Sequence, residues 1–195
     1  MFTGIVAGIG RIVNAEPREK GLRLTIDAGR VSLDDVAIGD SIAVNGCCLT
    51  VIARDGQRFD VDVSQETIDC TAGLGGPGEV NLEKSLTLAE RLGGHLVTGH
   101  VDGVGQVVCF EPVGESYLLR VRAPAPLARY IARKGSITVQ GVSLTVNRVD
   151  GEELEINLIP HTLAVTTLHA LAPGARVNLE VDLVARYVER LLDTR

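Results

Sequence analysis

Tryptophan is absent from this chain of 195 residues, and phenylalanine and tyrosine together bring the aromatic share to only 3%. A platform that stacks single-stranded nucleic acid depends on aromatic side chains, so the composition excludes an ordinary one. No basic stripe occurs either, and the net charge of −6 argues against a nucleic-acid partner. A site for a flat heterocycle would therefore be lined mainly by aliphatic side chains and backbone groups.

Long apolar runs and cysteine motifs are missing as well. No apolar stretch reaches the roughly 18 residues that a membrane span needs. The start, Met1–Val6, carries no positive region, so we expect no signal peptide. The four cysteines, Cys47, Cys48, Cys70 and Cys109, show no CxxC pair and no Cys/His ligand spacing, which argues against zinc. Reduced thiols in a cytoplasmic protein are the simplest interpretation.

What the chain does contain is a long internal repeat. Residues 41–51 reappear as 136–146, and Thr3-Gly4-Ile5-Val6 reappears as Thr98-Gly99-His100-Val101, both 95 positions later. A period of this length is typical of a duplicated domain rather than a solenoid. Each half is long enough to have its own hydrophobic core.

The repeat unit predicts a small β-barrel. Residues 22–28 and 59–63 alternate apolar and polar side chains, which is the period of a half-buried strand, and their partners in the second half do the same. An Asp-Gly pair, a strong hairpin signal, precedes the strand at 59–63 and its partner. With further strands at 4–13 and 80–83, about six short strands per unit favour an antiparallel barrel without exposed edges.

Four segments outside the strand pattern are expected to be helical. Residues 31–36 and 126–131 each suit one short helix, and 85–92 suits another that ends at a flexible Gly-Gly link between the halves. In the tail, 183–192, apolar residues recur at spacings of three and four and form a broad stripe. A helix this short needs a packing surface. Its own barrel or a subunit interface would serve, and we favour the interface.

Comparison of the two copies singles out candidate site residues. Cys48 and Thr50 lie on the strand face opposite the apolar one, and Ser143 and Thr145 occupy the matching positions. Each copy therefore carries a nucleophile-type side chain followed two residues later by a threonine hydroxyl. Cys48 alone would also suit a small buried filler. An apolar core does not favour a serine hydroxyl, however, so Ser143 argues for a site.

The positions at which the copies differ are equally informative. His100 stands where the first copy has Ile5, within the densest shared motif. An imidazole, whose pKa lies near neutrality, can bind or move protons there. His161 corresponds to Glu66, and a lone histidine at such a position is more commonly a structural or surface residue.

Two charged residues have a plain structural interpretation. Asp182 opens the tail helix, where aspartate is a preferred N-cap and suits the positive end of the helix. Lys134 precedes a glycine in a turn, which is typical of a solvated surface lysine.

Taken together, four motifs closely resemble those of the riboflavin synthase family, of the alpha-chain type built from tandem lumazine-binding repeats. They are MFTGIV at 1–6, NGCCLTV at 45–51, GGHLVTGH at 93–100 and LIPHTL at 158–163. The resemblance covers essentially the whole chain. It implies an all-β fold of two tandem six-stranded antiparallel Greek-key β-barrels plus a C-terminal α-helix. The expected divisions are an N-terminal lumazine-binding barrel at 1–94, a C-terminal one at 95–182 and a trimerisation helix at 183–195.

The resemblance also implies a reaction, the last step of riboflavin biosynthesis. Two molecules of 6,7-dimethyl-8-ribityllumazine dismutate by transfer of a four-carbon unit, giving riboflavin and 5-amino-6-ribitylaminouracil. The enzyme is a cytoplasmic transferase for which we expect no cofactor and no metal. Family members form homotrimers through the C-terminal helix, with the active site between the N-barrel of one subunit and the C-barrel of another. An association with lumazine synthase is left open.

Site residues follow from the matching positions. Catalytic roles are implied for Cys48, His100, Ser143, Thr145 and Asp182. The expected N-barrel pocket comprises Gly4, Ile5, Val6, Cys48, Leu49, Thr50, Asp62, Val63, Ser64, Gln65, Glu66 and Thr67. The expected C-barrel pocket comprises Gly99, His100, Val101, Lys134, Ser143, Leu144, Thr145, Asn157, Leu158, Ile159, Pro160, His161 and Thr162. Some family members carry Glu in place of His161, so that residue is assigned to the pocket alone.

The chemistry of the substrate suggests how these residues act. The C7 methyl group of the lumazine is acidic because the ring delocalises the resulting carbanion, and His100 is our candidate for the base or proton relay. The nucleophile that attacks C7 of the acceptor stays open among Cys48, Ser143, Thr145, water and a ribityl hydroxyl. Holding two identical rings face to face would supply a large share of the acceleration.

Two other functions compete with this interpretation. Lumazine proteins share the duplicated fold and hold the ligand as a light-emitting antenna, but have lost motif residues in one half, whereas both copies are intact here. A flavin-binding electron-transfer barrel normally comes with a nicotinamide-binding partner domain, and we expect no dinucleotide-binding strand, turn and helix in this chain.

Overall fold

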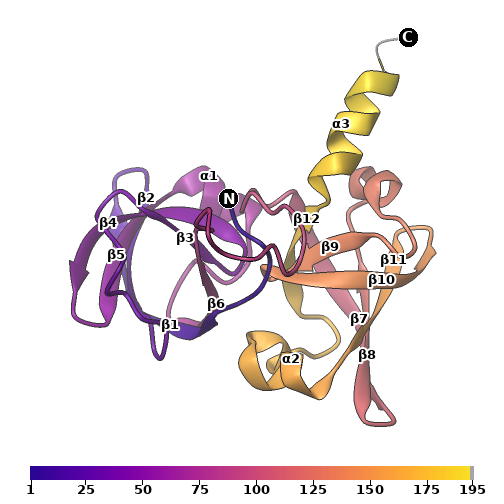
Figure 1. Cartoon of the computed structure of the whole chain (residues 1–195), viewed down its shortest axis with the longest axis horizontal. Coiled ribbons are helices and arrows are strands. Elements are labelled where there is room, and N and C mark those ends of the chain that lie inside the picture. The colour runs from indigo at the N-terminus through magenta and orange to yellow at the C-terminus, as the bar shows by residue number, and fades with distance from the viewer. Residues whose placement is uncertain (194–195) are drawn as a thin grey trace.

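The computed structural model describes residues 1–193 and contains two closed six-stranded antiparallel β-barrels that lie side by side (Figure 1). The strands of the N-barrel are β1 (Gly8–Arg18), β2 (Gly21–Asp27), β3 (Ser41–Val44), β4 (Cys47–Asp55), β5 (Arg58–Ser64) and β6 (Gly78–Lys84). Those of the C-barrel are β7 (Gly103–Val113), β8 (Ser116–Arg122), β9 (Ser136–Val139), β10 (Val142–Asp150), β11 (Glu153–Leu158) and β12 (Arg176–Val181). Corresponding strands have corresponding neighbours in the two rings, so the predicted tandem-barrel fold is confirmed.

Five short helices accompany the strands in the described part of the chain, and of these α1 and α2 occupy matching places in the two halves. The five are α1 (Gln65–Cys70), the 3-10 helix η1 (Ala125–Tyr130), α2 (Pro160–Val165), the 3-10 helix η2 (Thr167–Ala170) and α3 (Leu183–Leu192). Helix α3 confirms the predicted tail helix, and the last two residues of the expected segment, 194 and 195, lie outside the described residues. Within residues 1–193, no helix is both long enough and apolar enough to cross a membrane.

Two of the four predicted helices are wrong. Residues 85–92 are irregular apart from a turn at 88–89, because their first backbone amides bind other segments: the Ser85 amide donates to the carbonyl of Ser41 and the Leu86 amide to that of Met1. Residues 31–36 also form turns. There the Ser32 hydroxyl accepts a hydrogen bond from the Asp34 amide, and a side chain that captures backbone groups in this way competes with a helix. Residues 126–131 do form a helical turn, η1, shifted by one residue.

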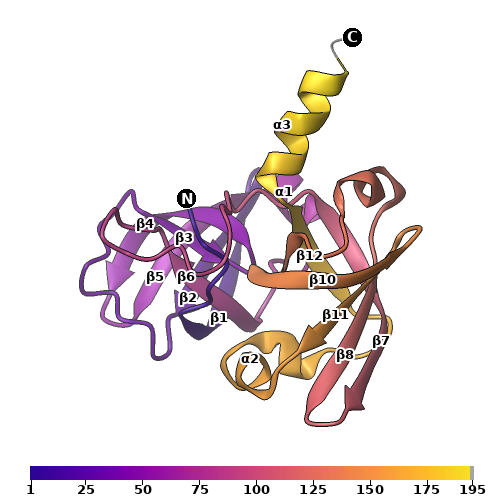
Figure 2. The ribbon, with the colours of Figure 1, turned by 45° about the vertical axis from the view of Figure 1, so that its right-hand side comes forward.

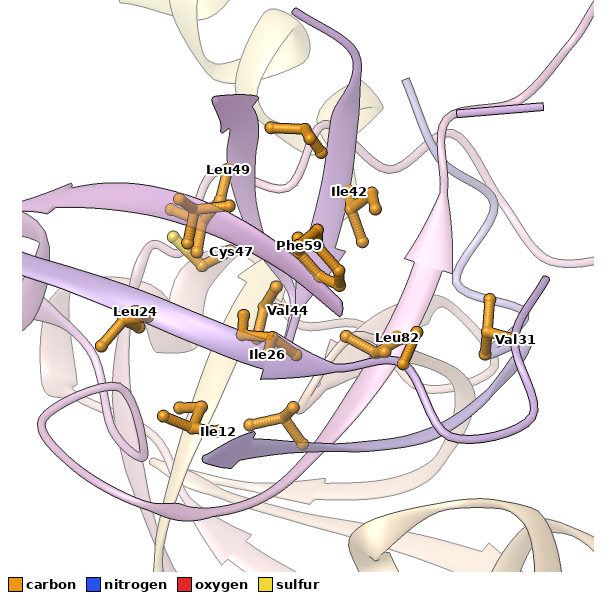
Figure 3. Packing of buried hydrophobic residues seen from close by; sticks show 14 of the residues in the cluster. Ile12, Leu24, Ile26, Val31, Ile42, Val44, Cys47, Leu49, Phe59 and Leu82 are labelled. Atoms are coloured by element: carbon orange, nitrogen blue, oxygen red, sulfur yellow. The ribbon is translucent and has the colours of Figure 1, made fainter. Parts of the chain in front are cut away.

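Alternating side chains build one core inside each barrel. In the N-barrel, Leu24, Ile26 and Phe59 point into the interior and are at most 1% exposed (Figure 3). The C-barrel has a separate core built from the equivalent strands. Burying a large aliphatic or aromatic side chain stabilises a fold by about 1.5–3 kcal/mol, so each half has its own driving force for folding.

A reciprocal hydrogen-bond network joins the two barrels. The side-chain amide of Asn81 donates to the carbonyl of Gln140 at 2.9 Å, and that of Asn178 donates to the carbonyl of Asn45 at 2.9 Å. Both asparagines are buried, and Asn178 also accepts from the backbone amide of Ala72 at 2.6 Å. Because the bonds to Gln140 and Asn45 correspond in the two copies, the barrels are related by an approximate two-fold axis.

Two glycines lie where the barrels approach most closely. Gly46 and Gly141 have φ angles of 81° and 78°, in the left-handed region that favours glycine. A Cβ atom on Gly141 would lie 2.7 Å from the backbone nitrogen of Gly46, so neither position has room for a side chain. Glycine is therefore required at both positions, for the left-handed turn and for the close contact between the barrels.

The leading segments of the two repeats cross over between the barrels. Phe2 and Val97 pair as an antiparallel bridge, with hydrogen bonds of 2.8 and 3.1 Å between their backbones. Beyond this bridge, Val6 packs against the core of the C-barrel and Val101 packs against the core of the N-barrel. The expected strand at 4–13 is therefore wrong in its first part: residues 4–7 run across to the other barrel, and β1 begins at Gly8.

Candidate active site

A hollow of about 320 Å³ on the N-barrel gathers several of the predicted residues. It is lined by Cys47, Cys48, Glu66, Thr67, Cys70, Thr71, Gly99, His100 and Val101. Strand β4 supplies the first two residues, α1 and the residue after it supply the next four, and the crossing segment of the second repeat supplies the last three. Its volume lies at the lower end of the range of small-molecule sites.

His100 reaches this hollow because its segment is fixed to β4. The backbone amide of Cys48 donates to the carbonyl of Gly99 at 2.8 Å, and Val101 packs against the N-barrel core. A Cβ atom on Gly99, whose φ is 77°, would lie 2.7 Å from the Cβ of Cys48, so only glycine permits this approach. The imidazole of His100 is exposed at the edge of the hollow, within the same pocket as Cys48.

The equivalent arrangement occurs at the C-barrel. The backbone amide of Ser143 donates to the carbonyl of Gly4 at 2.7 Å, and a Cβ atom on Gly4 would lie 2.6 Å from the Cβ of Ser143. The expected grouping of the two pockets is thus corrected. Residues 99–101 join Cys48 on the N-barrel, and residues 4–6 join Ser143 on the C-barrel, because each leading segment crosses to the other half.

A buried carboxylate holds each crossing segment in place. One oxygen of Glu83 accepts from both the amide and the hydroxyl of Thr3, at 2.6 and 2.8 Å, and the other oxygen accepts from the Gly4 amide at 3.0 Å. Glu180 binds Thr98 and Gly99 in the same way, at 2.7 to 2.9 Å. Burial raises the pKa of Glu83, while its hydrogen bonds to Thr3 and Gly4 act in the opposite direction.

His95, which was not among the predicted site residues, lies beside Ser143. Its Nδ1 lies 2.7 Å from the Ser143 hydroxyl, and its buried Nε2 has no hydrogen-bond partner. Burial lowers the pKa of His95, although the charges of Asp182 and Glu180 oppose this effect. A neutral imidazole in this place can hold the serine hydroxyl or exchange a proton with it. His95 precedes the first shared position of the repeat, so comparing the copies could not reveal it.

The thiols in the N-barrel hollow differ in environment. Cys47 is buried, and desolvation raises its pKa to about 12, so it stays a thiol at neutral pH. Cys48 is only partly buried and faces the hollow, and Cys70, at the end of α1, is exposed. Cys48 and Cys70 are both accessible in the hollow, and Cys48 is the one whose backbone is bonded to the segment that carries His100.

The structure does not bring every predicted N-barrel residue into the hollow. Leu49 and Val63 belong to the barrel core, and Thr50 is exposed. Asp62 forms a bidentate ion pair with Arg23, at 2.8 and 2.9 Å, which lowers the pKa of Asp62. Ser64 caps α1 by accepting from the Thr67 amide, Gln65 binds Asp69, and Ile5 is 52% exposed. From the predicted stretch 62–67, only Glu66 and Thr67 line the hollow.

The predicted C-barrel residues occupy the equivalent strand and helix. Leu158 lies in the core, Leu144 packs against it, and Thr145, Asn157, Ile159, Pro160 and His161 are exposed. The carbonyl of Thr162 accepts from the hydroxyl of Thr166 at 2.6 Å, which repeats the contact between Thr67 and Thr71. Lys134 is exposed and binds the side chain of Asn147 at 3.2 Å, and Asp182 is confirmed as the N-cap of α3.

Comparisons with known proteins agree with this geometry. The family described as the lumazine binding domain matches residues 3–85 and again residues 98–182. Two solved structures of LumP resemble the chain, each covering 93% of it and 99% of LumP. The complex with riboflavin has a TM-score of 0.83 at 30% identity, and that with 6,7-dimethyl-8-(1'-D-ribityl) lumazine has 0.82 at 28%. The fold and site thus define a tandem lumazine-binding protein.

Full-length relatives narrow this class further. Riboflavin synthase of Mycobacterium tuberculosis is 49% identical over 200 residues, which cover 98% of each chain. Riboflavin synthase of Photobacterium phosphoreum is 42% identical over 194 residues, which cover 98% of this chain and 89% of that protein. The chain belongs to the riboflavin synthase family, whose reaction is that of a transferase.

Proposed function

We propose that this chain catalyses the dismutation of two molecules of 6,7-dimethyl-8-ribityllumazine to riboflavin and 5-amino-6-ribitylaminouracil. The observation that carries the proposal is the pair of related but chemically different sites. One site combines Cys48 with His100, and the other combines Ser143 with His95. Two related sites suit two identical rings, and different side chains suit the unequal roles of donor and acceptor.

His100 is our candidate for the group that moves the proton of the acidic C7 methyl. It lines the same hollow as Cys48, and because it is exposed it can exchange protons with solvent. In the other site the His95 imidazole lies within hydrogen-bond distance of the Ser143 hydroxyl, so Ser143 can act as a proton carrier or a nucleophile. Asp182 contributes a charge that opposes the lowering of the pKa of His95.

The remaining pocket residues would fix the rings rather than react. Backbone amides and carbonyls of the crossing segments, and the hydroxyls of Thr67 and Thr162 at matching positions, suit the polar edges of a lumazine. Thr145 and Lys134, which are both exposed on the C-barrel, would contact a ligand that a second subunit holds. Orienting the two rings is the main catalytic effect that we expect of the protein.

We also propose that the enzyme is a cytoplasmic homotrimer assembled through α3. The helix projects outward from the C-barrel (Figures 1 and 2). Its apolar residues Val184, Tyr187 and Val188 are 60%, 65% and 49% exposed, so the stripe does not pack on its own barrel. Three such stripes would cover one another in a bundle. We propose in addition that the domain boundaries fall at residues 94 and 182. The active site would then lie between barrels of neighbouring subunits, and the enzyme would associate with lumazine synthase.

Incubating the purified chain with 6,7-dimethyl-8-ribityllumazine tests the activity directly. We expect riboflavin and 5-amino-6-ribitylaminouracil in equal amounts, with two molecules of substrate consumed for each riboflavin formed. Chromatography with fluorescence detection measures both, and sedimentation velocity measures the mass of the assembly. Absence of riboflavin at micromolar enzyme would refute the proposal.

One alternative has an observation in its favour, namely the similarity to LumP with bound lumazine or riboflavin. A protein that only holds the ligand would retain one unchanged chromophore per chain after the incubation. Both copies here carry the polar strand motif, Cys48-Leu49-Thr50 and Ser143-Leu144-Thr145, which favours turnover over storage.

A further inference from the structure

Asp102 is a buried acidic residue at the base of α3 that the reaction chemistry leaves unused. Its side chain is only 3% exposed, and the first repeat has Ala7 at the matching position. Asp and Glu are almost never fully buried unless they are paired. The acid is present in one copy alone, and its partners indicate its role.

Two contacts connect Asp102 to the start of α3. One carboxylate oxygen accepts a hydrogen bond from the backbone amide of Val181 at 2.7 Å, at the end of β12. The other forms an ion pair with the guanidinium of Arg186 in the second turn of α3. The backbone amide of Asp102 also donates to the carbonyl of Leu179 at 2.8 Å. Asp102 thus links strand β12 to α3.

The polar side of α3 makes a second contact with the same barrel. Glu189 forms an ion pair of 2.9 Å with Arg129 and accepts a hydrogen bond from the hydroxyl of Tyr130, both in η1. Arg186 and Glu189 are three residues apart and share one face of the helix. Because these contacts hold one face to the C-barrel, the direction in which the apolar stripe projects is fixed.

The other side of Asp102 leads into the candidate active site. His100 is two residues earlier, and the intervening Val101 packs against the N-barrel core. Gly99, at the start of this stretch, is bound by Cys48 and by Glu180. Residues 99–102 are therefore held by the pocket at one end and by α3 at the other.

From this arrangement we propose that Asp102 is a positioning residue that couples the placement of α3 to the placement of His100. The inference rests on the proposed synthase function and on assembly through α3. When α3 packs against its counterparts, the position of Arg186 is fixed. The ion pair with Asp102 then fixes the segment that carries His100. Catalysis in the N-barrel pocket then depends on a residue pair that touches no substrate.

Removing the charge of Arg186 tests this coupling. Arg186→Met leaves the buried carboxylate of Asp102 without its cation, which favours a shift of residues 99–102. We expect kcat per assembled enzyme to fall by about ten- to a hundredfold, the scale of a small misplacement of a catalytic group, with KM changed by less than about threefold. Arg190→Met, one turn further along the helix, is the matched control, and we expect its kcat to stay within about twofold of the wild type.

A double variant separates positioning from folding. Asp102→Asn keeps the size of the side chain and an oxygen for the Val181 amide, and removes the charge. In the Asp102→Asn/Arg186→Met protein no unpaired charge is left, so kcat should exceed that of Arg186→Met alone. Arg186→Lys should also recover most of the activity, because a cation is restored.

Sedimentation, melting temperature and steady-state kinetics are measured on the same samples with 6,7-dimethyl-8-ribityllumazine. Equal kcat for Arg186→Met and Arg190→Met would overturn the coupling, as would a loss of turnover that matches the loss of assembled enzyme. A double variant no better than Arg186→Met would overturn it too. A wild-type chain that forms no riboflavin would refute the proposed function itself, and the coupling with it.

Discussion

Replacing Gly141 by alanine tests how tightly the two repeats are joined. Its φ of 78° lies in the left-handed region, where an L-residue costs about 1–2 kcal/mol. The new Cβ would also lie 2.7 Å from the backbone nitrogen and 2.9 Å from the Cα of Gly46, and backbone atoms cannot rotate away. Overpacking of this kind costs about 1–3 kcal/mol, so we expect the substitution to remove roughly 2–5 kcal/mol of stability in all.

Gly151→Ala is the control for the backbone cost alone. Gly151 has a φ of 58° in the next hairpin, between β10 and β11, and no heavy atom lies within 4 Å of a Cβ placed there. The difference between the two variants therefore isolates the contact with Gly46. At about 2–4 °C per kcal/mol for a chain of this size, we expect Gly141→Ala to melt roughly 2–12 °C below Gly151→Ala by calorimetry. Equal melting temperatures would show that the barrels separate easily, and would refute the close junction.

Three further predictions concern the site and the assembly. His100→Ala and Cys48→Ala should each lower kcat by at least about tenfold while the melting temperature stays within about 3 °C, and losses that run in parallel would mean a structural role for both. Because burial lowers the pKa of His95 below the 6.5 of an ordinary histidine, the unfolded chain takes up the proton first as the pH falls. The contribution of neutral His95 to stability should therefore be fully present above about pH 6.5 and decline below it. His95→Asn should flatten that decline in melting curves recorded from about pH 8 to 5, and an unchanged slope would contradict the assignment. Val188→Asp places a charge in the exposed apolar stripe of α3 and should convert trimers to monomers in sedimentation velocity without unfolding the barrels, whereas an unchanged mass would remove α3 from the interface.

The strands were predictable because alternation is a local property. Residues 22–28 and 59–63 carry their period of two within a few residues, and each became a strand with shifts of about one residue at its ends. The helix expected at 85–92 was wrong for the opposite reason. Its apolar residues have the spacing of a helix, but the Leu86 amide donates to the carbonyl of Met1, a contact across the whole repeat that no local pattern contains.

The sequence placed some of the predicted residues together correctly, but it did not predict how the segments are grouped. Comparison of the copies selected Cys48, His100 and Ser143, because matched or diverged side chains can be read directly from the sequence. It assigned His100 to the barrel of its own repeat, whereas Gly99 binds Cys48 of the other barrel. Alternation states which face of a strand a side chain occupies, and contains nothing about a segment that leaves its own barrel.

The crossing of the leading segments bears on how such a chain arose. A single repeat, standing alone, would extend its first residues away from its own barrel and leave its pocket without one wall. Two copies of that repeat could each lend the other this arm, as in a domain-swapped dimer. Fusing them end to end keeps the exchange and makes it permanent, and only then can one arm acquire a histidine at position 100 while the other keeps an isoleucine at position 5. The fused chain can therefore carry different side chains at the two matching positions.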